Sequence, residues 1–117
     1  MSYRKYLELS KKYLEEGKNY LAKGDLVQTS EKVWGSVAEA VKAAADKRGW
    51  EHSRHHHLET VISRLIEETK DVELGRLYSV AERLHANFYE NFATLIEVEA
   101  YIEDAKKLIE KLEKLTI

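Results

Sequence analysis

Histidine and arginine side chains gather in one short stretch of this 117-residue chain, which holds four of its five histidines. The residues of this stretch are Arg48, His52, Arg54, His55, His56 and His57. A histidine can take or give a proton near neutral pH, and an arginine can hold a phosphate and stabilise its developing charge. Arg48 and His55 are therefore candidate catalytic residues for cleavage of a phosphodiester without a metal.

The same stretch could bind a ligand without cutting it. Trp50 could stack on a base, and His52, Arg54 and His56 could attract an anion. A polar connector is the simpler interpretation: His52 could pack against the protein, Ser53 could cap the next helix and Arg54 could be solvated. The sequence alone leaves both interpretations open.

A metal site is not expected in this stretch. Neighbouring residues of a helix point about 100° apart, so three consecutive histidines cannot all face one ion. His52 and His56 could share a helix face, but the sequence places no carboxylate to complete a site with them. Because the chain has no Cys, thiolate ligands, disulfides and Cys nucleophiles are excluded. We predict no metal and no other cofactor.

Glu82 and His85 form a second candidate pair. The Glu-x-x-His spacing puts both side chains on one helix face, as in carboxylate-bridged di-iron bundles. Those proteins need two such pairs and two further glutamates; this chain has one pair, so a dimer would have to supply the other. His85 shares its face with Ala81 and Leu84, and a buried, hydrogen-bonded structural histidine is the simpler interpretation.

Composition and charge limit the remaining functional classes. The chain has 19 Lys and Arg against 21 Asp and Glu, a formal net charge of −2, and lacks the basic excess of a general nucleic-acid coat. Its apolar runs are too short for a transmembrane helix or a signal peptide, so we expect a soluble cytoplasmic protein without membrane contact. Abundant Glu and Lys are typical of proteins from thermophiles.

Helical periodicity predicts the elements that carry these residues. Tyr-Leu pairs recur every seven residues in the first segment, and Ser10 and Gly17 lie between them, where a second helix could approach closely. Gly24 ends this helix and Asp25 caps the next one. The second helix runs over about 26–47, and its many alanines make it slim enough to be a central helix.

Three more helices follow the polar stretch. The apolar spacing predicts a third helix from Leu58, a fourth that starts after the cap Asp71 and breaks or kinks near Asn87, and a last one whose seam begins at Leu95. The chain has no Pro and five Gly, which suits helices joined by tight turns. We therefore expect a single all-α domain over residues 1–117, folded as a five-helix up-and-down bundle.

Four segments carry a family resemblance that covers nearly the whole chain. They are Lys23-Gly24-Asp25, the segment from Ser30 to Gly35, the segment from Lys47 to Ser53, and Leu84-His85-Ala86-Asn87-Phe88-Tyr89-Glu90. Together they resemble the archaeal PaREP family, a branch of the HEPN superfamily (higher eukaryotes and prokaryotes nucleotide-binding). The resemblance implies a helical bundle of HEPN type.

The resemblance also implies partners and a chemistry. HEPN domains are often homodimers, and many are encoded beside a small nucleotidyltransferase, as in toxin–antitoxin-like pairs. The tyrosine stripe and the seam of the last helix could each supply the dimer interface. Many HEPN proteins are metal-independent ribonucleases with an Arg followed by a His, and Arg48 and His55 match that spacing. Other branches keep only a His shortly before a Leu, as His55 or His56 stand before Leu58, and bind without cutting.

The sequence therefore predicts a small, non-enzymatic, homodimeric module. Its ligand would be a nucleotide, an RNA or other nucleic acid, or a partner protein such as a nucleotidyltransferase. The alternatives are a metal-independent endoribonuclease that uses Arg48 and His55, and a purely structural interaction protein.

Overall fold

Five α-helices follow one another in residues 2–117, the part of the chain that the computed structural model describes. They are α1 (Tyr3–Ala22), α2 (Leu26–Arg48), α3 (His55–Thr69), α4 (Glu73–Glu90) and α5 (Leu95–Thr116). No strand occurs in these residues, so the predicted all-α five-helix bundle is confirmed. None of these helices is long and apolar enough to cross a membrane.

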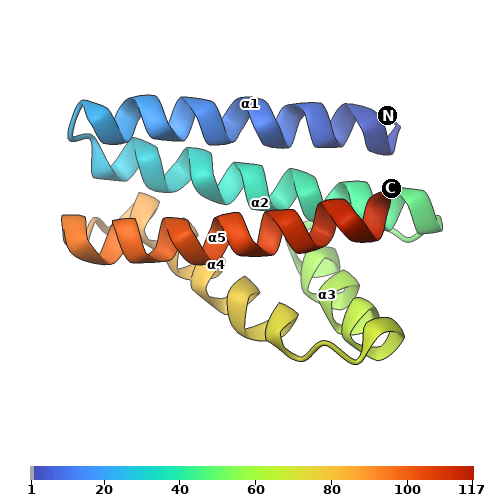
Figure 1. Cartoon of the computed structure of the whole chain (residues 1–117). Helices are drawn as coiled ribbons and strands as arrows, with labels where there is room; N and C mark the ends of the chain where they lie inside the picture. Colours follow the sequence, from blue (N-terminus) through green and yellow to red (C-terminus); the bar gives the residue numbers. More distant parts are fainter. Residues whose placement is uncertain (1) are drawn as a thin grey trace.

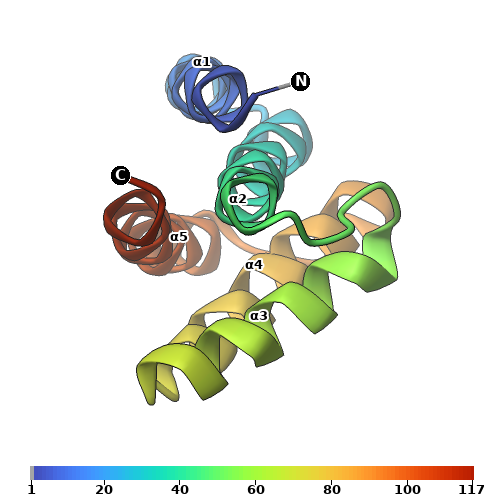
Figure 2. The same cartoon turned by 90° about the vertical axis from the view of Figure 1, so that its right-hand side faces the viewer.

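Helix α2 is the centre of the bundle. Helices α1, α2 and α5 run side by side, while α3 and α4 form a hairpin that crosses beneath them (Figures 1 and 2). Helix α2 contacts all four other helices, as its alanine-rich sequence predicted. Its fully buried residues include Val37, Ala40 and Val41, around which the largest core side chains of α3, α4 and α5 pack.

Helix α1 packs closely against α2 at its two small residues. The Ser10 and Ser36 hydroxyls donate to each other's backbone carbonyls, at 2.8 Å and 2.6 Å. A Cβ atom at Gly17 would lie 2.9 Å from Cγ2 of Val33, closer than such atoms approach one another. The close approach that the sequence predicted at Ser10 and Gly17 is therefore present.

The turns before and after α2 follow the expected glycine chemistry. Gly24 has φ +78° and Gly49 has φ +72°, in the left-handed region that other residues enter at a cost. The Asp25 carboxylate accepts a hydrogen bond from the Gln28 N–H at 3.0 Å, which confirms the predicted cap. Each glycine thus ends one helix and turns the chain.

A cluster of ion pairs holds the turn between α3 and α4 against α5. The Lys111 ammonium lies 2.7 Å from Asp71 Oδ2 and 3.2 Å from Glu73 Oε1. The other oxygen of Asp71 accepts from the Glu73 N–H at 3.1 Å, although the N-cap of α4 is Val72, one residue after the predicted Asp71. The hydrogen bond from Lys111 lowers the pKa of Asp71. The turn that joins α3 to α4 is therefore tied to α5.

Two sequence-based helix boundaries were wrong. Helix α3 begins at His55 rather than Leu58, because the His57 Nδ1 accepts from the Arg54 N–H and replaces the expected Ser53 cap. Helix α4 does not break near Asn87 but continues to Glu90, since the Asn87 side chain is buried and caps the following turn. Helix α5 does begin at Leu95, as predicted, but Leu95 is half exposed and the buried seam starts at Val98.

Candidate functional site

Arg48, the predicted phosphate-binding residue, is held within its own chain. Its Nε and Nη2 donate to the two carboxylate oxygens of Glu68 on α3, at 2.9 Å and 2.7 Å. Its Nη1 donates to the Ala44 carbonyl at 3.0 Å. The hydrogen bond from Arg48 lowers the pKa of Glu68, as expected for a two-point pair of a guanidinium and a carboxylate. All three nitrogens of Arg48 are therefore occupied.

Arg48, the last residue of α2, lies beside the final turns of α3, whereas His55 is the first residue of α3. Arg48 contacts Glu68, which is thirteen residues after His55 on α3, or about 20 Å along the helix axis. His55 instead stacks on Trp34, which lies about 21 Å before Arg48 on α2 by the same helix rise. A single copy of the chain therefore does not bring these two residues to one phosphate.

The four predicted ligand-binding residues contact different parts of the chain. Trp50 lies beneath the Arg64 guanidinium, 4.0 Å from the ring centroid. His52 meets the edge of Tyr6 with ring centroids 5.2 Å apart. His56 is exposed beside His57, and Arg54 is exposed at the start of α3. These residues follow the connector around the end of the bundle and do not converge on one ligand.

His55 instead joins a group of rings from three helices. Its imidazole stacks on Trp34 of α2 and on His85 of α4, with centroids 5.1 Å and 5.2 Å away. Trp34 and His85 also touch each other, at 4.8 Å, and the edge of Tyr89 meets His85 at 5.3 Å. The first residue of α3 is therefore anchored on the central helix.

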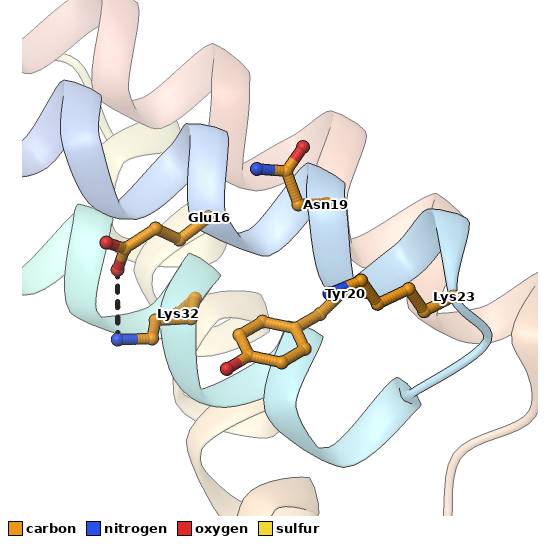
Figure 3. Close-up of a pocket in the computed structure, with 5 residues that line it drawn as sticks. All are labelled: Glu16, Asn19, Tyr20, Lys23 and Lys32. Carbon is orange, nitrogen blue, oxygen red and sulfur yellow. Dashed lines mark ion pairs between the residues drawn. The ribbon is translucent and has the colours of Figure 1, made fainter.

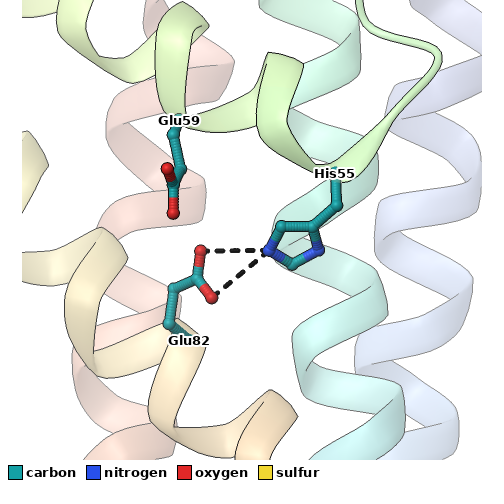
Figure 4. Close-up of side chains that lie close together, drawn as sticks. All are labelled: His55, Glu59 and Glu82. Carbon is teal, nitrogen blue, oxygen red and sulfur yellow. Dashed lines mark hydrogen bonds and ion pairs between the residues drawn. The ribbon is translucent and has the colours of Figure 1, made fainter.

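Two glutamates lie next to His55, and their side chains point toward it (Figure 4). The His55 Nε2 lies 3.2 Å and 3.3 Å from the two carboxylate oxygens of Glu82 on α4. Glu59, one helical turn after His55, completes a group whose three donor atoms all lie within 4.8 Å of one another. Glu59 was not among the residues predicted from the sequence. The signal available was the pairing of His55-x-x-x-Glu59 with Glu82-x-x-His85.

His85 packs by its ring rather than by hydrogen bonds. Its Nδ1 is buried and has no hydrogen-bond partner in the described residues, which corrects the expectation of a hydrogen-bonded histidine. Burial lowers the pKa of His85, and the neighbouring His55 lowers it further. Both effects favour the neutral form of the His85 ring. Arg83, on the same helix, contacts Phe92 and the Tyr101 hydroxyl rather than the polar connector.

A shallow pocket lies on the opposite side of α2, between α1 and α2 (Figure 3). It measures about 260 Å³ and is lined by Glu16, Asn19, Tyr20, Lys23 and Lys32. The Lys32 ammonium lies 3.0 Å from the Glu16 carboxylate, and their hydrogen bond raises the pKa of this lysine. Because the Lys32 ammonium is already paired with Glu16, this pocket offers little to an anionic ligand.

An apolar patch is exposed where α4 passes into α5. The patch consists of Tyr89, Phe92, Leu95 and Ile96, and Tyr89 and Ile96 are 71% and 80% exposed. At one edge of this patch, the Arg83 guanidinium lies 4.5 Å from the centroid of the Phe92 ring. A group of large apolar side chains on a surface usually marks a contact with another molecule.

Comparisons with known proteins agree with this fold. The architecture and the ring group define a small all-helical domain built around one central helix. The chain belongs to the archaeal PaREP1/PaREP8 family, whose model matches residues 5–109. It is similar to a protein from Sulfolobus solfataricus of known crystal structure, with 25% identity and a TM-score of 0.82 over 92% of this chain and 96% of that chain. Curated proteins give no significant match.

Proposed function

We propose that the chain is a non-enzymatic helical module of HEPN type that acts by binding protein, and that its first partner is a second copy of itself. The observation that carries this proposal is the exposure of Tyr89, Leu95 and Ile96 on one short segment. Burial of such side chains is the main favourable term in protein association. A nucleotidyltransferase-type protein is the further partner class that the HEPN resemblance implies.

The charges around the patch support pairing with an identical copy. A twofold interface brings the same surface to both sides, so a residue of one copy faces a different residue of the other. Arg83 lies at one edge of the patch, and the exposed acidic residues Glu90 and Glu99 flank it in the sequence. A surface with an apolar centre and both charge signs at its rim can complement itself. Aromatic and arginine side chains are also those that contribute most at interfaces.

Replacement of Ile96 by glutamate is expected to convert the protein from a dimer into a monomer. The substitution places a charge on the most exposed residue of the patch, where a second copy would have to desolvate it. Light scattering after size exclusion should give twice the 13.6 kDa chain mass for the wild type and the single mass for Ile96→Glu.

Val72→Glu is the matched control for this experiment. Val72 is 64% exposed and lies at the other end of α4, about 26 Å from Tyr89 along the helix. This variant should stay dimeric, and both variants should keep the wild-type melting temperature within a few degrees. A wild type that is monomeric at all concentrations, or a dimeric Ile96→Glu variant, would contradict the proposal.

Ribonuclease activity is the alternative that Arg48 and His55 define. It needs a composite site in which Arg48 of one copy meets His55 of the other, and Arg48 must first leave Glu68. We therefore expect no RNA cleavage in the presence of EDTA beyond that of identically purified Arg48→Ala and His55→Ala variants. Cleavage by the wild type that disappears in both variants would establish the enzyme instead.

A further inference from the structure

The group formed by His55, Glu59 and Glu82 has the donor types of a metal site. One imidazole nitrogen and two carboxylates converge from two helices, and their nearest donor atoms lie within 4.8 Å of one another (Figure 4). His55 and Glu59 are four residues apart on α3, so both project from the same helix face. Glu82 approaches from α4, which packs against α3. The site is thus built on helices rather than on a loop.

The distances fit an ion between these atoms. Two ligands bound 2.0–2.1 Å from a tetrahedral ion lie about 3.3 Å apart. The His55 Nε2 and the Glu82 oxygens already have this spacing, at 3.2 Å and 3.3 Å. Glu59 is exposed, so its carboxylate can reach the ion by rotating about its own side-chain bonds.

The charge of the group also favours a cation. Two carboxylates lie close together, and no lysine or arginine in residues 2–117 forms an ion pair with Glu59 or Glu82. The single neighbour of opposite potential charge is His55, which is charged only when protonated. Among the described residues, neither carboxylate is thus paired with a permanently charged side chain, and a divalent ion would compensate their charge.

A buried hydroxyl beside the carboxylates is a second, independent observation. Tyr78 is only 5% exposed, and its buried hydroxyl lies next to the Glu82 carboxylate, close enough for that carboxylate to act on it by hydrogen bonding. Burial raises the pKa of Tyr78, and the negative charges of Glu82 and Glu59 raise it further, so both carboxylates lie near this hydroxyl. A buried hydroxyl beside a metal-binding carboxylate can orient that carboxylate as an outer partner.

We propose that His55, Glu59 and Glu82 bind one divalent transition-metal ion per chain, with Tyr78 as the outer hydrogen-bond donor to the carboxylates. One nitrogen and two oxygens suit Zn²⁺, Co²⁺ or Mn²⁺, which accept imidazole and carboxylate together. Three protein ligands leave at least one position for water. The ion fastens the beginning of α3 to α4. This proposal departs from the sequence-based expectation of no metal, which weighed the histidine run and the Glu82-x-x-His85 pair but not Glu59.

Co²⁺ titration of the tag-free, chelator-treated full chain tests this proposal, because Co²⁺ reports its coordination by visible absorption. The wild type should take up one ion per chain, with Zn²⁺ competing for the same site. Glu82→Gln and Glu59→Gln keep the shape of each side chain but remove its charge, and each should weaken binding at least tenfold. The wild type should melt at a higher temperature with Zn²⁺ than without it, and Glu59→Gln should not.

His56→Ala is the matched control. This exposed histidine stands next to His55 but outside the group, so its loss should leave the affinity and the Co²⁺ spectrum unchanged. Two results would overturn the proposal: a wild type that binds neither ion, or ion binding that survives in both glutamine variants and disappears in His56→Ala. The second result would assign the ion to the histidine run instead. Circular dichroism of each variant establishes that it is folded.

Discussion

Replacement of Asn87 by alanine is expected to lower the free energy of unfolding by about 2–5 kcal/mol. The Asn87 side chain is fully buried, and its Oδ1 accepts from the Phe92 and Ala93 N–H groups, both at 2.8 Å. Its Nδ2 donates to the Ser30 hydroxyl on α2 at 2.9 Å. Alanine leaves two backbone donors without an acceptor, and each such group costs about 1–3 kcal/mol when it is buried.

Chemical denaturation at fixed protein concentration measures this loss, with two controls. Ser30→Ala removes one of the three hydrogen bonds and should cost less, about 1–2 kcal/mol. Asn91→Gly changes an exposed asparagine at φ +49°, where glycine is tolerated, and should leave stability nearly unchanged. A loss from Asn87→Ala no larger than that from Ser30→Ala would mean that the turn finds other acceptors.

Asn87 also connects stability to the proposed interface. The two N–H groups that it binds belong to the turn between α4 and α5, and that turn carries Phe92 and leads to Leu95 and Ile96. A polar side chain at the end of one helix thus fixes the orientation of the exposed apolar patch. The predicted break near Asn87 rested on the capping-box spacing of Asn87 with Glu90, which is typical of a helix start. The spacing correctly indicates a capping residue at Asn87. The contact with Ser30, however, directs the Asn87 side chain to the turn after α4 rather than to the start of a new helix.

Most of the fold follows from local rules. Gly24 and Gly49 end helices because they adopt positive φ angles, and the alanines of α2 allow four neighbours to approach it. These effects depend on residues near in sequence or on one helix face. The start of α3, by contrast, was predicted too late. The hydrogen bond between the His57 ring and the Arg54 N–H uses a side chain that rarely caps helices.

The candidate site depends on contacts between helices and is predicted less well. Arg48 and His55 have a suggestive spacing in sequence, but the connector runs back along α2 to the level of Trp34. Helix α3 then runs toward Arg48 and ends beside it. The partners of His55 are Trp34 and Glu82, at separations of 21 and 27 residues. No local pattern encodes those separations. The pair Glu82 and His85 on α4 was predicted from its helical spacing, whereas the pair His55 and Glu59 on α3 was not.

Replacement of Trp34 by alanine is expected to cost about 3–5 kcal/mol, the usual range for loss of a buried aromatic ring. Trp34 is 6% exposed and touches the rings of His55, His85 and Tyr78. Its removal opens a cavity at the point where α3 begins. Trp34→Phe keeps an aromatic face for His55 and should lose less.

The loss of stability in Trp34→Ala should be concentrated in the first turns of α3. Helix α3 packs less extensively on the bundle than α1 or α5 does, so its first turns depend strongly on the Trp34 ring. Amide hydrogen exchange of the Trp34→Ala variant should accelerate in the first two turns of α3 more than in α1. Trp50→Ala is the matched control, because Trp50 is only partly buried beneath Arg64 and contacts the other end of the hairpin. Equal losses of stability from the two tryptophans, with no change specific to the start of α3, would show that His55 is positioned by Glu82 and the helix itself rather than by the central helix.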